Sequence, residues 1–328
     1  MEREKKELEE RRHNMNTALQ IQQTGYLQNS KQEVTAELFE QFISYLDASP
    51  KTVETYTRAL RQLFNWLSLN GIRKPDRADI LAYKEDLKAS GHKPTTIQNY
   101  ITAAKIFFSW TAQQGYYPNI AEHIKGAKLD REHKKDYLTS RQVKEILCSI
   151  ELDTEQGKRD YAMLALMTTG GLRTIEVSRA DIADIGTVGD NTVLFVQGKG
   201  REEKTEYVKL DPVVDKAIRE YLICRGSAEE NAPLFSSLSN NSNGSRLSTR
   251  AVSGIVKQRM RAAGYDSSKL TAHSLRHTAV TLSLLAGKDI TEVQQFARHA
   301  NISTTMIYNH ALDKSKNSCS EAIAKAIF

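Results

Sequence analysis

Cysteine is scarce in this sequence, whose 328 residues include only Cys148, Cys224 and Cys319. The three lie far apart, their number is odd, and no CxxC pair occurs, so no disulfide framework is indicated. We therefore expect a protein of the reducing cytoplasm, in which these thiols are ordinary packed residues.

Long apolar runs are also missing. No stretch of about 18 apolar residues is present, so we expect no transmembrane helix. The first residues, MEREKKELEERRHN, carry charges of both signs without the apolar core of a secretory signal. Positive charge, by contrast, is in excess, with 46 Lys and Arg against 40 Asp and Glu. This excess permits binding of nucleic acid through its phosphates but does not establish it.

The first part of the chain is predicted to be helical. Residues 1–32 form a polar segment, rich in charge and glutamine, which we expect to be helical or disordered. Residues 33–127 carry apolar side chains at helical spacing. Helix starts are indicated by Ser49 before Pro50, and by Pro94. Four helices with short connections predict a small all-α bundle.

The second part combines helices with one change of period. Residues 128–137 are largely charged and predict a linker. Residues 138–328 are mainly helical in pattern, and a last helix is expected over 318–328. Two β-rich runs flank Lys199, which lies between two glycines, so an antiparallel hairpin is predicted. The predicted fold is therefore mainly α, with a four-helix domain followed by a mixed, mostly helical domain that contains a small antiparallel β-sheet.

Several polar residues stand in places that need explanation, although each has an ordinary one. Arg173 follows a double glycine in TTGGLRTIEV, where the backbone is expected to approach another group closely, but a surface arginine after a helix end is equally common. Lys199 alone is an exposed turn lysine. Tyr308, after two apolar residues, is by itself typical of a half-buried core position.

The segment TAHSLRHT raises the question of a metal site. His273 and His277 are spaced i, i+4, as in some zinc pairs. The glutamate of the HExxH motif is missing, however, and Arg276 puts a fixed positive charge beside the pair. We therefore expect no metal there and assign His277 a structural role.

Taken together, these residues have the chemistry for phosphoryl transfer without a metal. Arginine side chains match phosphate oxygens and stabilise the charge that develops on phosphorus. A tyrosine oxygen can attack phosphorus and keep the bond energy as an ester. Histidine and lysine can carry the protons of the entering and leaving oxygens. The candidate catalytic set is Arg173, Lys199, His273, Arg276, His299 and Tyr308.

The order of this set resembles that of the tyrosine recombinase, or phage integrase, family. TGGLRTIEV is similar to its first arginine motif, with an extra glycine, and HSLRHT is similar to its second. STTMIY matches the pattern that ends in the nucleophile. One departure concerns the leucine-glycine-histidine of the family, which here is Ala297-Arg298-His299. It keeps the histidine and adds a charge beside the site.

The resemblance implies a role for each residue. Tyr308 would attack a scissile phosphate and form a 3′-phosphotyrosyl bond, while Arg173, Arg276 and His299 contact the non-bridging oxygens. Lys199 would protonate the leaving 5′-oxygen. Further, His273 would handle the tyrosine proton and Glu176 would orient Arg173 or His273. No ATP, metal or other cofactor is needed.

The resemblance also implies partners. Double-stranded DNA with inverted-repeat core sites would be bound between the two domains, and the helices that begin at Pro50 and Pro94 would enter the major groove. The residues expected to contact DNA are Lys51, Thr52, Tyr56, Arg61, Lys93, Thr95, Thr96, Asn99 and Lys105. The apolar stripe of residues 318–328 would dock on a neighbouring protomer, giving a homotetramer on two duplexes, although packing on its own domain is the alternative.

Three functions fit these expectations. The first is a site-specific recombinase, as the integrase or excision recombinase of a mobile element or as a Xer-like resolvase of chromosome dimers. The second is a type IB topoisomerase, which shares the chemistry but not the four-subunit assembly. The third is a DNA-binding protein without catalysis, against which the complete polar set argues.

Overall fold

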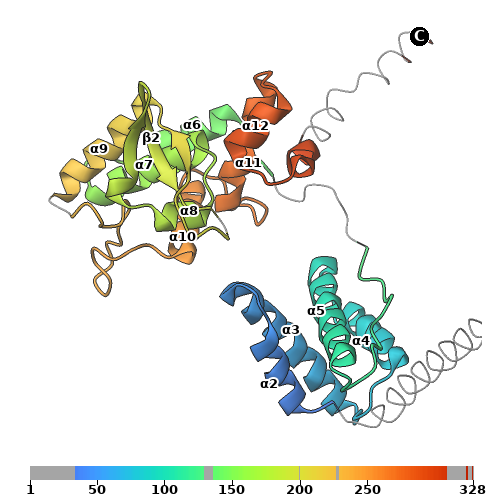
Figure 1. Ribbon diagram of the computed structural model, residues 1–328. Coiled ribbons are helices and arrows are strands. Elements are labelled where there is room, and N and C mark those ends of the chain that lie inside the picture. Colours follow the sequence, from blue (N-terminus) through green and yellow to red (C-terminus); the bar gives the residue numbers. More distant parts are fainter. Residues whose placement is uncertain are drawn as a thin grey trace, which may run out of the picture. The chain divides into compact units, whose positions relative to one another are not determined.

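The computed structural model describes residues 34–128, 136–198, 200–226 and 229–308, together with Ile323 and Ile327. The chain divides into two compact units, Met1–Asp130 and Arg131–Phe328, which are described separately (Figure 1). The predicted N-terminal segment, Lys199 and most of both the linker and the tail helix lie outside the described residues.

The first unit contains four described helices that match the predicted bundle. They are α2 (Ala36–Tyr45), α3 (Pro50–Leu69), α4 (Arg77–Ala89) and α5 (Pro94–Gln113). The start of α3 is as predicted, because the Ser49 hydroxyl accepts a hydrogen bond from the Thr52 amide at 3.3 Å and Pro50 takes the first helical position.

Aromatic side chains fill the core of this unit. Phe107 of α5 makes edge-to-face contacts with Phe42 of α2 at 5.4 Å and with Phe64 of α3 at 5.3 Å between ring centroids. Phe42 and Phe107 are both fully buried. Helices α2, α3 and α5 are therefore joined by one cluster, and α4 packs against α5. Their other faces are left on the surface.

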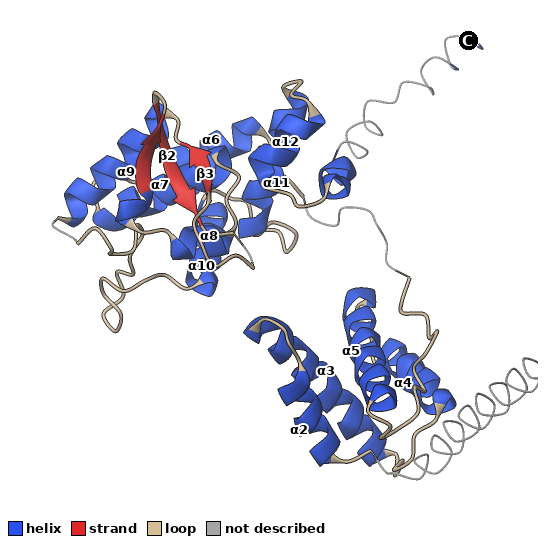
Figure 2. Ribbon diagram, in the orientation of Figure 1, coloured by secondary structure: helices blue, strands red, loops and turns tan. Residues whose placement is uncertain are grey.

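The second unit is mostly helical, with one small sheet (Figure 2). Its described elements are α6 (Ser140–Cys148), α7 (Glu155–Thr169), α8 (Thr174–Arg179), η1 (Ile182–Asp184), β1 (Ile185–Val188), β2 (Asn191–Val196), β3 (Glu206–Lys209), α9 (Pro212–Arg225), α10 (Thr249–Ala262), α11 (Ala272–Leu285) and α12 (Ile290–Ala297). Residues 302–308 are also helical. The fold class is therefore as predicted.

The sheet is antiparallel and has the order β1-β2-β3. The predicted hairpin is its β2–β3 pair, in which Val196 lies opposite Glu206. Strand β1 was not predicted. It pairs with β2 across a tight turn in which Gly189 has φ +57°, a conformation that favours glycine. Leu194 and Val196 of β2 belong to the main core of the unit.

Segments that are distant in the sequence meet where α8, α11 and α12 come together. The buried helix α7 packs against α9 and α11, and α11 also packs against α12. The short helix α8, which was not predicted, starts directly after the end of α7 and packs against α10. As a result, the start of α8, the middle of α11 and the end of α12 meet, and these positions carry the predicted arginines and His299.

Candidate active site

The double glycine at the end of α7 makes a close approach possible. Gly171 has φ +58°, and a Cβ atom on it would lie 3.2 Å from the ring of Phe296 in α12. On Gly170, a Cβ atom would lie 2.5 Å from a methyl carbon of Leu172. A larger residue at position 171 would therefore press on α12, and one at position 170 would displace the side chain of Leu172. This agrees with the prediction that the backbone approaches another group here.

Arg276 is the buried link between these segments. It lies in α11 with a relative exposure of 1%. Its Nη1 donates to the carbonyl oxygen of Gly171 at 2.6 Å, and its Nη2 donates to that of Ala297. A guanidinium has five N–H donors, so these two bonds leave three for another acceptor. Burial and the charge of Arg173 lower the pKa of Arg276 to about 9, and the side chain stays charged at neutral pH.

Arg173 is held by Glu176. The expectation was that Glu176 orients either Arg173 or His273, and it contacts Arg173. Its backbone amide and Nη1 donate to the two carboxylate oxygens at 2.8 and 2.7 Å. The carboxylate is completely buried and also forms an ion pair of 2.9 Å with Arg298. Burial would raise the pKa of Glu176, but the charge of Arg298 and the hydrogen bonds from Arg173 outweigh it and hold the pKa below its ordinary value. Glu176 is therefore a carboxylate.

His299 follows α12 and faces the same site. Its Nδ1 shares a hydrogen bond of 2.9 Å with the buried hydroxyl of Thr305. Burial and then the positive charges of Arg276 and Arg173 lower the pKa of His299 to about 4. At neutral pH the ring is therefore uncharged and can donate a neutral hydrogen bond from Nε2 when Nδ1 is the acceptor.

Tyr308 is packed beside His299 with a relative exposure of 7%. The two rings are stacked with centroids 6.4 Å apart, and the tyrosine belongs to a small apolar cluster with Val280 and Val293. Its hydroxyl is hydrogen-bonded to Nδ1 of His277. Burial raises the pKa of Tyr308 to about 12, against the opposing charges of Arg276 and Arg173. The phenol is thus protonated at neutral pH and needs a base before it can attack.

His277, to which a structural role was assigned, contacts the hydroxyl of Tyr308. His277 is buried and meets the tyrosine hydroxyl, whereas His273 is exposed. The two histidine rings are in edge-to-face contact, with centroids 4.4 Å apart. The i, i+4 spacing was the signal that could have placed both rings on one face of α11.

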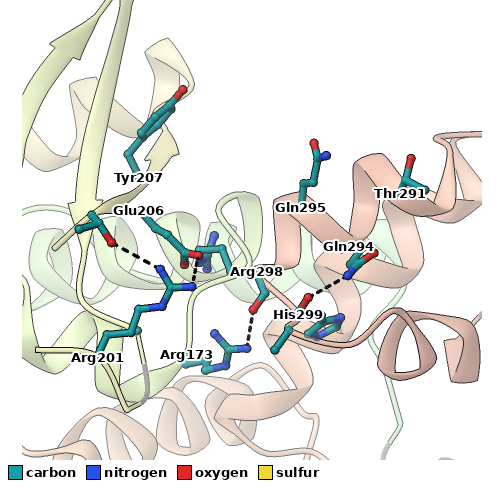
Figure 3. Close-up of a pocket in the computed structure, with 12 residues that line it drawn as sticks. Arg173, Arg201, Glu206, Tyr207, Thr291, Gln294, Gln295, Arg298 and His299 are labelled. Carbon is teal, nitrogen blue, oxygen red and sulfur yellow. Dashed lines mark hydrogen bonds and ion pairs between the residues drawn. The ribbon is translucent and has the colours of Figure 1, made fainter. Parts of the chain in front are cut away.

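A cleft of about 740 Å³ opens at this site (Figure 3). Arg173, Arg298 and His299 lie on one side, and Arg201 and Tyr207 of the β2–β3 hairpin lie on the other. The cleft is open to solvent and lined mainly by polar and basic groups, which suits an anionic chain more than an apolar ligand. Lys199, predicted to lie at the tip of the same hairpin, is outside the described residues.

A second hairpin lysine has a different position. Lys204 Nζ forms ion pairs with Asp181 at 2.7 Å and Asp184 at 2.6 Å, and these bonds outweigh its burial and raise its pKa. Its proton is therefore held more tightly than that of an ordinary lysine. Lys204 fixes the hairpin, and Lys199 remains the candidate acid.

The residues predicted to contact DNA lie on the helices α3 and α5 of the first unit, except Lys93, which directly precedes α5, and their exposure differs. Five are exposed and four are partly buried. The exposed ones are Lys51, Arg61, Lys93, Thr95 and Asn99, and the partly buried ones are Thr52, Tyr56, Thr96 and Lys105.

Two of these positions differ from the others. Lys105 lines a separate hollow beside Phe42 and Trp110, and Thr52 takes part in the cap of α3.

Among the described residues, no group of three or more His, Cys, Asp and Glu side chains is arranged to hold a metal ion. In the same part of the chain, no helix is long and apolar enough to cross a membrane.

The sequence matches two family descriptions, "Phage integrase family" over residues 136–315 and "Phage integrase, N-terminal SAM-like domain" over residues 37–115. The chain belongs to the phage integrase family. It is therefore a tyrosine recombinase, a member of a family of enzymes that cleave and rejoin DNA, as the resemblance implied.

Curated relatives agree with this assignment. The chain is 32% identical to a tyrosine recombinase XerC of Herpetosiphon aurantiacus, over 83% of this chain and 89% of that protein. It is 29% identical to a tyrosine recombinase of Synechococcus elongatus, over 85% of this chain and 90% of that one.

Solved structures share the fold. A XerH site-specific recombinase bound to a palindromic difH substrate has a TM-score of 0.67 at 24% identity, covering 82% of this chain and 80% of that one. The Tn1549 transposon integrase in complex with transposon right end DNA has a TM-score of 0.66 at 18% identity, covering 83% and 93%.

Proposed function

We propose that this tyrosine recombinase is a site-specific recombinase that exchanges DNA strands through a 3′-phosphotyrosyl intermediate formed by Tyr308. The observation that carries the proposal is the position of the Tyr308 hydroxyl. It is hydrogen-bonded to a histidine, stacked beside His299, and close enough to Arg276 and Arg173 for their charges to lower its pKa. Side chains suited to act as nucleophile, base and phosphate-binding groups thus lie side by side in one unit, which supports the proposal.

The phosphate would be bound by Arg173, Arg276 and His299. Arg173 lines the cleft and keeps part of its guanidinium exposed. The two arginines match the non-bridging oxygens and stay charged, and neutral His299 adds a hydrogen bond. These donors are fixed before the phosphate arrives, so they stabilise the charge that develops on phosphorus without reorganisation.

The chemical step balances with these groups alone. The oxygen of Tyr308 forms a bond to phosphorus while the bond from phosphorus to the 5′-oxygen breaks. The phenol proton passes to His277, and His273, exposed and in ring contact with His277, exchanges it with water. Lys199 gives a proton to the leaving 5′-oxygen. Attack by another 5′-hydroxyl reverses the step, and the ester keeps the energy that rejoining needs.

A nicked suicide DNA tests this proposal. Cleavage near the nick releases a short oligonucleotide, so the covalent complex cannot be rejoined. The unmodified protein should form an adduct that survives denaturation, and Tyr308→Phe should bind the DNA without forming one. An undiminished adduct in Tyr308→Phe would overturn the proposal, and so would strong inhibition of the unmodified protein by a chelator.

The biological role that we propose is integration and excision of a mobile element, and resolution of chromosome dimers is the alternative. The match to the phage integrase family is compatible with the first, and the names of the XerC relatives support the second. Sequencing of DNA covalently trapped in cells decides between them. Element ends and their junctions would support an integrase, and one fixed chromosomal locus would support a resolvase.

Contact with DNA through the first unit is also part of the proposal. The exposed Asn99 is in the right chemical class to read a base, whereas the exposed Lys93 would contact phosphate. Asn99→Ala should relax the preference for one base pair by about 1–3 kcal/mol, and Lys93→Ala should reduce the salt dependence of binding by about one phosphate contact. Lys216→Ala, an exposed lysine of α9, is the control and should change neither.

Assembly of four subunits on two duplexes would use the tail, residues 318–328. The two described side chains of this segment, Ile323 and Ile327, are 58% and 68% exposed and are spaced i, i+4. Such a pair suits docking on a neighbouring protomer. Removal of residues 318–328 should weaken pairing of two DNA sites more than binding of one, and equal losses would favour packing within the protomer. A topoisomerase would relax DNA without such pairing.

A further inference from the structure

Arg298 has an unusual backbone for an arginine. Its φ of +53° and ψ of +46° are left-handed, a region that favours glycine. The side chain is nevertheless only 5% exposed. It turns back beneath the cleft instead of pointing into solvent, as a basic residue at a helix end usually does.

The guanidinium of Arg298 closes a buried network. Its Nη2 donates to Glu176 at 2.9 Å and to the carbonyl of Gly171 at 3.2 Å, and its Nη1 donates to the carbonyl of Phe296 at 2.9 Å. It thus connects the carboxylate of α8 to the end of α7 and to α12.

The backbone of Arg298 also contacts Arg173. Its carbonyl oxygen accepts a hydrogen bond of 3.1 Å from Nη2 of Arg173 (Figure 3). Arg173 is therefore fixed at one nitrogen by Arg298 itself and at two others by Glu176, which Arg298 holds from the opposite side.

We propose that Arg298 is a positioning residue, which holds the guanidinium of Arg173 in place for the scissile phosphate through its own carbonyl oxygen and through Glu176. The inference rests on the proposed function, in which Arg173 contacts that phosphate. Fixed geometry of such a donor contributes to the rate, because the donor then needs no reorganisation during the reaction.

The charges of the site support this role. Three arginines, Arg173, Arg276 and Arg298, interact with the single negative charge of Glu176. A phosphodiester has one negative charge, and the pentacoordinate state on the way to the ester has two. Without Arg298, Glu176 would take up more of the charge of Arg173, and less of that charge would be left for the phosphate.

Single-turnover cleavage of the suicide DNA by Arg298→Met tests the role. We expect the cleavage rate constant to fall by up to about 100-fold, the cost that misplacement of a catalytic group can have. Affinity for the intact site should fall much less than the rate constant, and Arg298→Lys should recover part of the rate. Arg298→Gly relieves the left-handed backbone, so it should cleave slowly even if it melts at a higher temperature.

A matched control is available in the same unit. Arg259 also pairs with a completely enclosed carboxylate, that of Asp160, at 2.7 Å, but neither residue lines the cleft. Arg259→Met should lower the melting temperature and leave the rate constant of the folded protein unchanged. If it slows cleavage as much as Arg298→Met does, the effect is general loss of structure and the positioning role is wrong.

The pH profile separates positioning from packing. The charged groups that face Glu176 are Arg173 on its own segment, Arg276 on α11 and Arg298 after α12. Loss of Arg298 raises the pKa of Glu176, so the fall of the cleavage rate at acid pH should begin at a higher pH in Arg298→Met. In a Glu176→Gln background, Arg298→Met should not shift the pH at which the cleavage rate falls. The double variant Glu176→Gln with Arg298→Met should cleave no more slowly than the slower of the two single variants.

The possible failures are distinguishable. If the unmodified protein forms no adduct through Tyr308, the proposed function is wrong. If it forms the adduct and Arg298→Met cleaves at the same rate with the same pH profile, the function stands and the positioning role is wrong.

Discussion

The hydroxyl of Tyr308 is hydrogen-bonded to Nδ1 of His277, and the partner histidine one turn earlier, His273, is exposed. Burial holds the phenol in its protonated form by raising its pKa to about 12. The first step of the proposed reaction therefore depends on a base that touches the hydroxyl, and in our proposal His277 is that base.

Replacement of the two histidines should have unequal effects. His277→Ala removes the direct hydrogen-bond partner of the Tyr308 hydroxyl and should slow adduct formation by about 100-fold or more, the range of general base catalysis. His273→Ala removes only the exchange with water and should slow it less. Single-turnover cleavage of the suicide DNA measures both. A larger effect of His273→Ala would restore the direct role that the sequence predicted for it.

The lysine of the hairpin tip should act on the leaving group. Lys199→Ala should slow cleavage of ordinary DNA by about 100-fold or more. A substrate with sulfur in place of the bridging 5′-oxygen leaves without protonation, so it should restore the rate of this variant.

Lys204→Ala is the control for this experiment, because Lys204 is bound to Asp181 and Asp184 and fixes the hairpin. The sulfur substrate should not restore its rate. If the sulfur substrate restored the cleavage rate of Lys204→Ala and not that of Lys199→Ala, Lys204 would be the acid and Lys199 would not.

Local signals in the sequence were sufficient for much of the fold. Proline after a capping serine predicted the start of α3, and a change from helical to alternating spacing predicted the β2–β3 pair. Strand β1 escaped because it has four residues, of which none is fully buried, so its apolar pattern is weak.

Tertiary contacts decided what the sequence left open in the site. The spacing of His273 and His277 is compatible with either one facing the tyrosine, and the packing of residues 302–308 on α11 determines which does. Arg298 was recognised as an added charge beside the site. Its burial depends on a left-handed backbone and on Glu176, 122 positions away in the chain, and no local pattern encodes that pair.

Gly171 should be more sensitive to substitution than another glycine of the same conformation. Gly171 and Gly189 have φ of +58° and +57°, but a Cβ atom meets the Phe296 ring at 3.2 Å only at Gly171 and meets nothing within 4 Å at Gly189. Gly189→Ala should lower the free energy of unfolding by about 1–2 kcal/mol from the backbone alone.

Gly171→Ala adds the displacement of α12 and should cost about 1–3 kcal/mol more. Because Arg276 donates to the carbonyl of Gly171, cleavage by Gly171→Ala should also slow, whereas Gly189→Ala should cleave normally. Urea unfolding and single-turnover cleavage test the pair. Equal losses of stability would mean that α12 adjusts without strain.

His299 should make the protein less stable at mildly acid pH. Burial and the charges of Arg276 and Arg173 lower its pKa from 6.5 to about 4, so the unfolded chain binds a proton in this range that the folded chain does not. The free energy of unfolding must then decrease as the pH falls from about 6.5 towards 4. Allowing for the partial exposure of the ring, we expect a loss of about 1 kcal/mol between pH 7 and pH 5.

His299→Asn has no group that titrates here and keeps a hydrogen-bonding atom for Thr305, so urea unfolding at the two pH values should show a smaller decrease for the variant. An equal decrease would mean that His299 is charged in the folded protein, and it would then contact the phosphate as a cation.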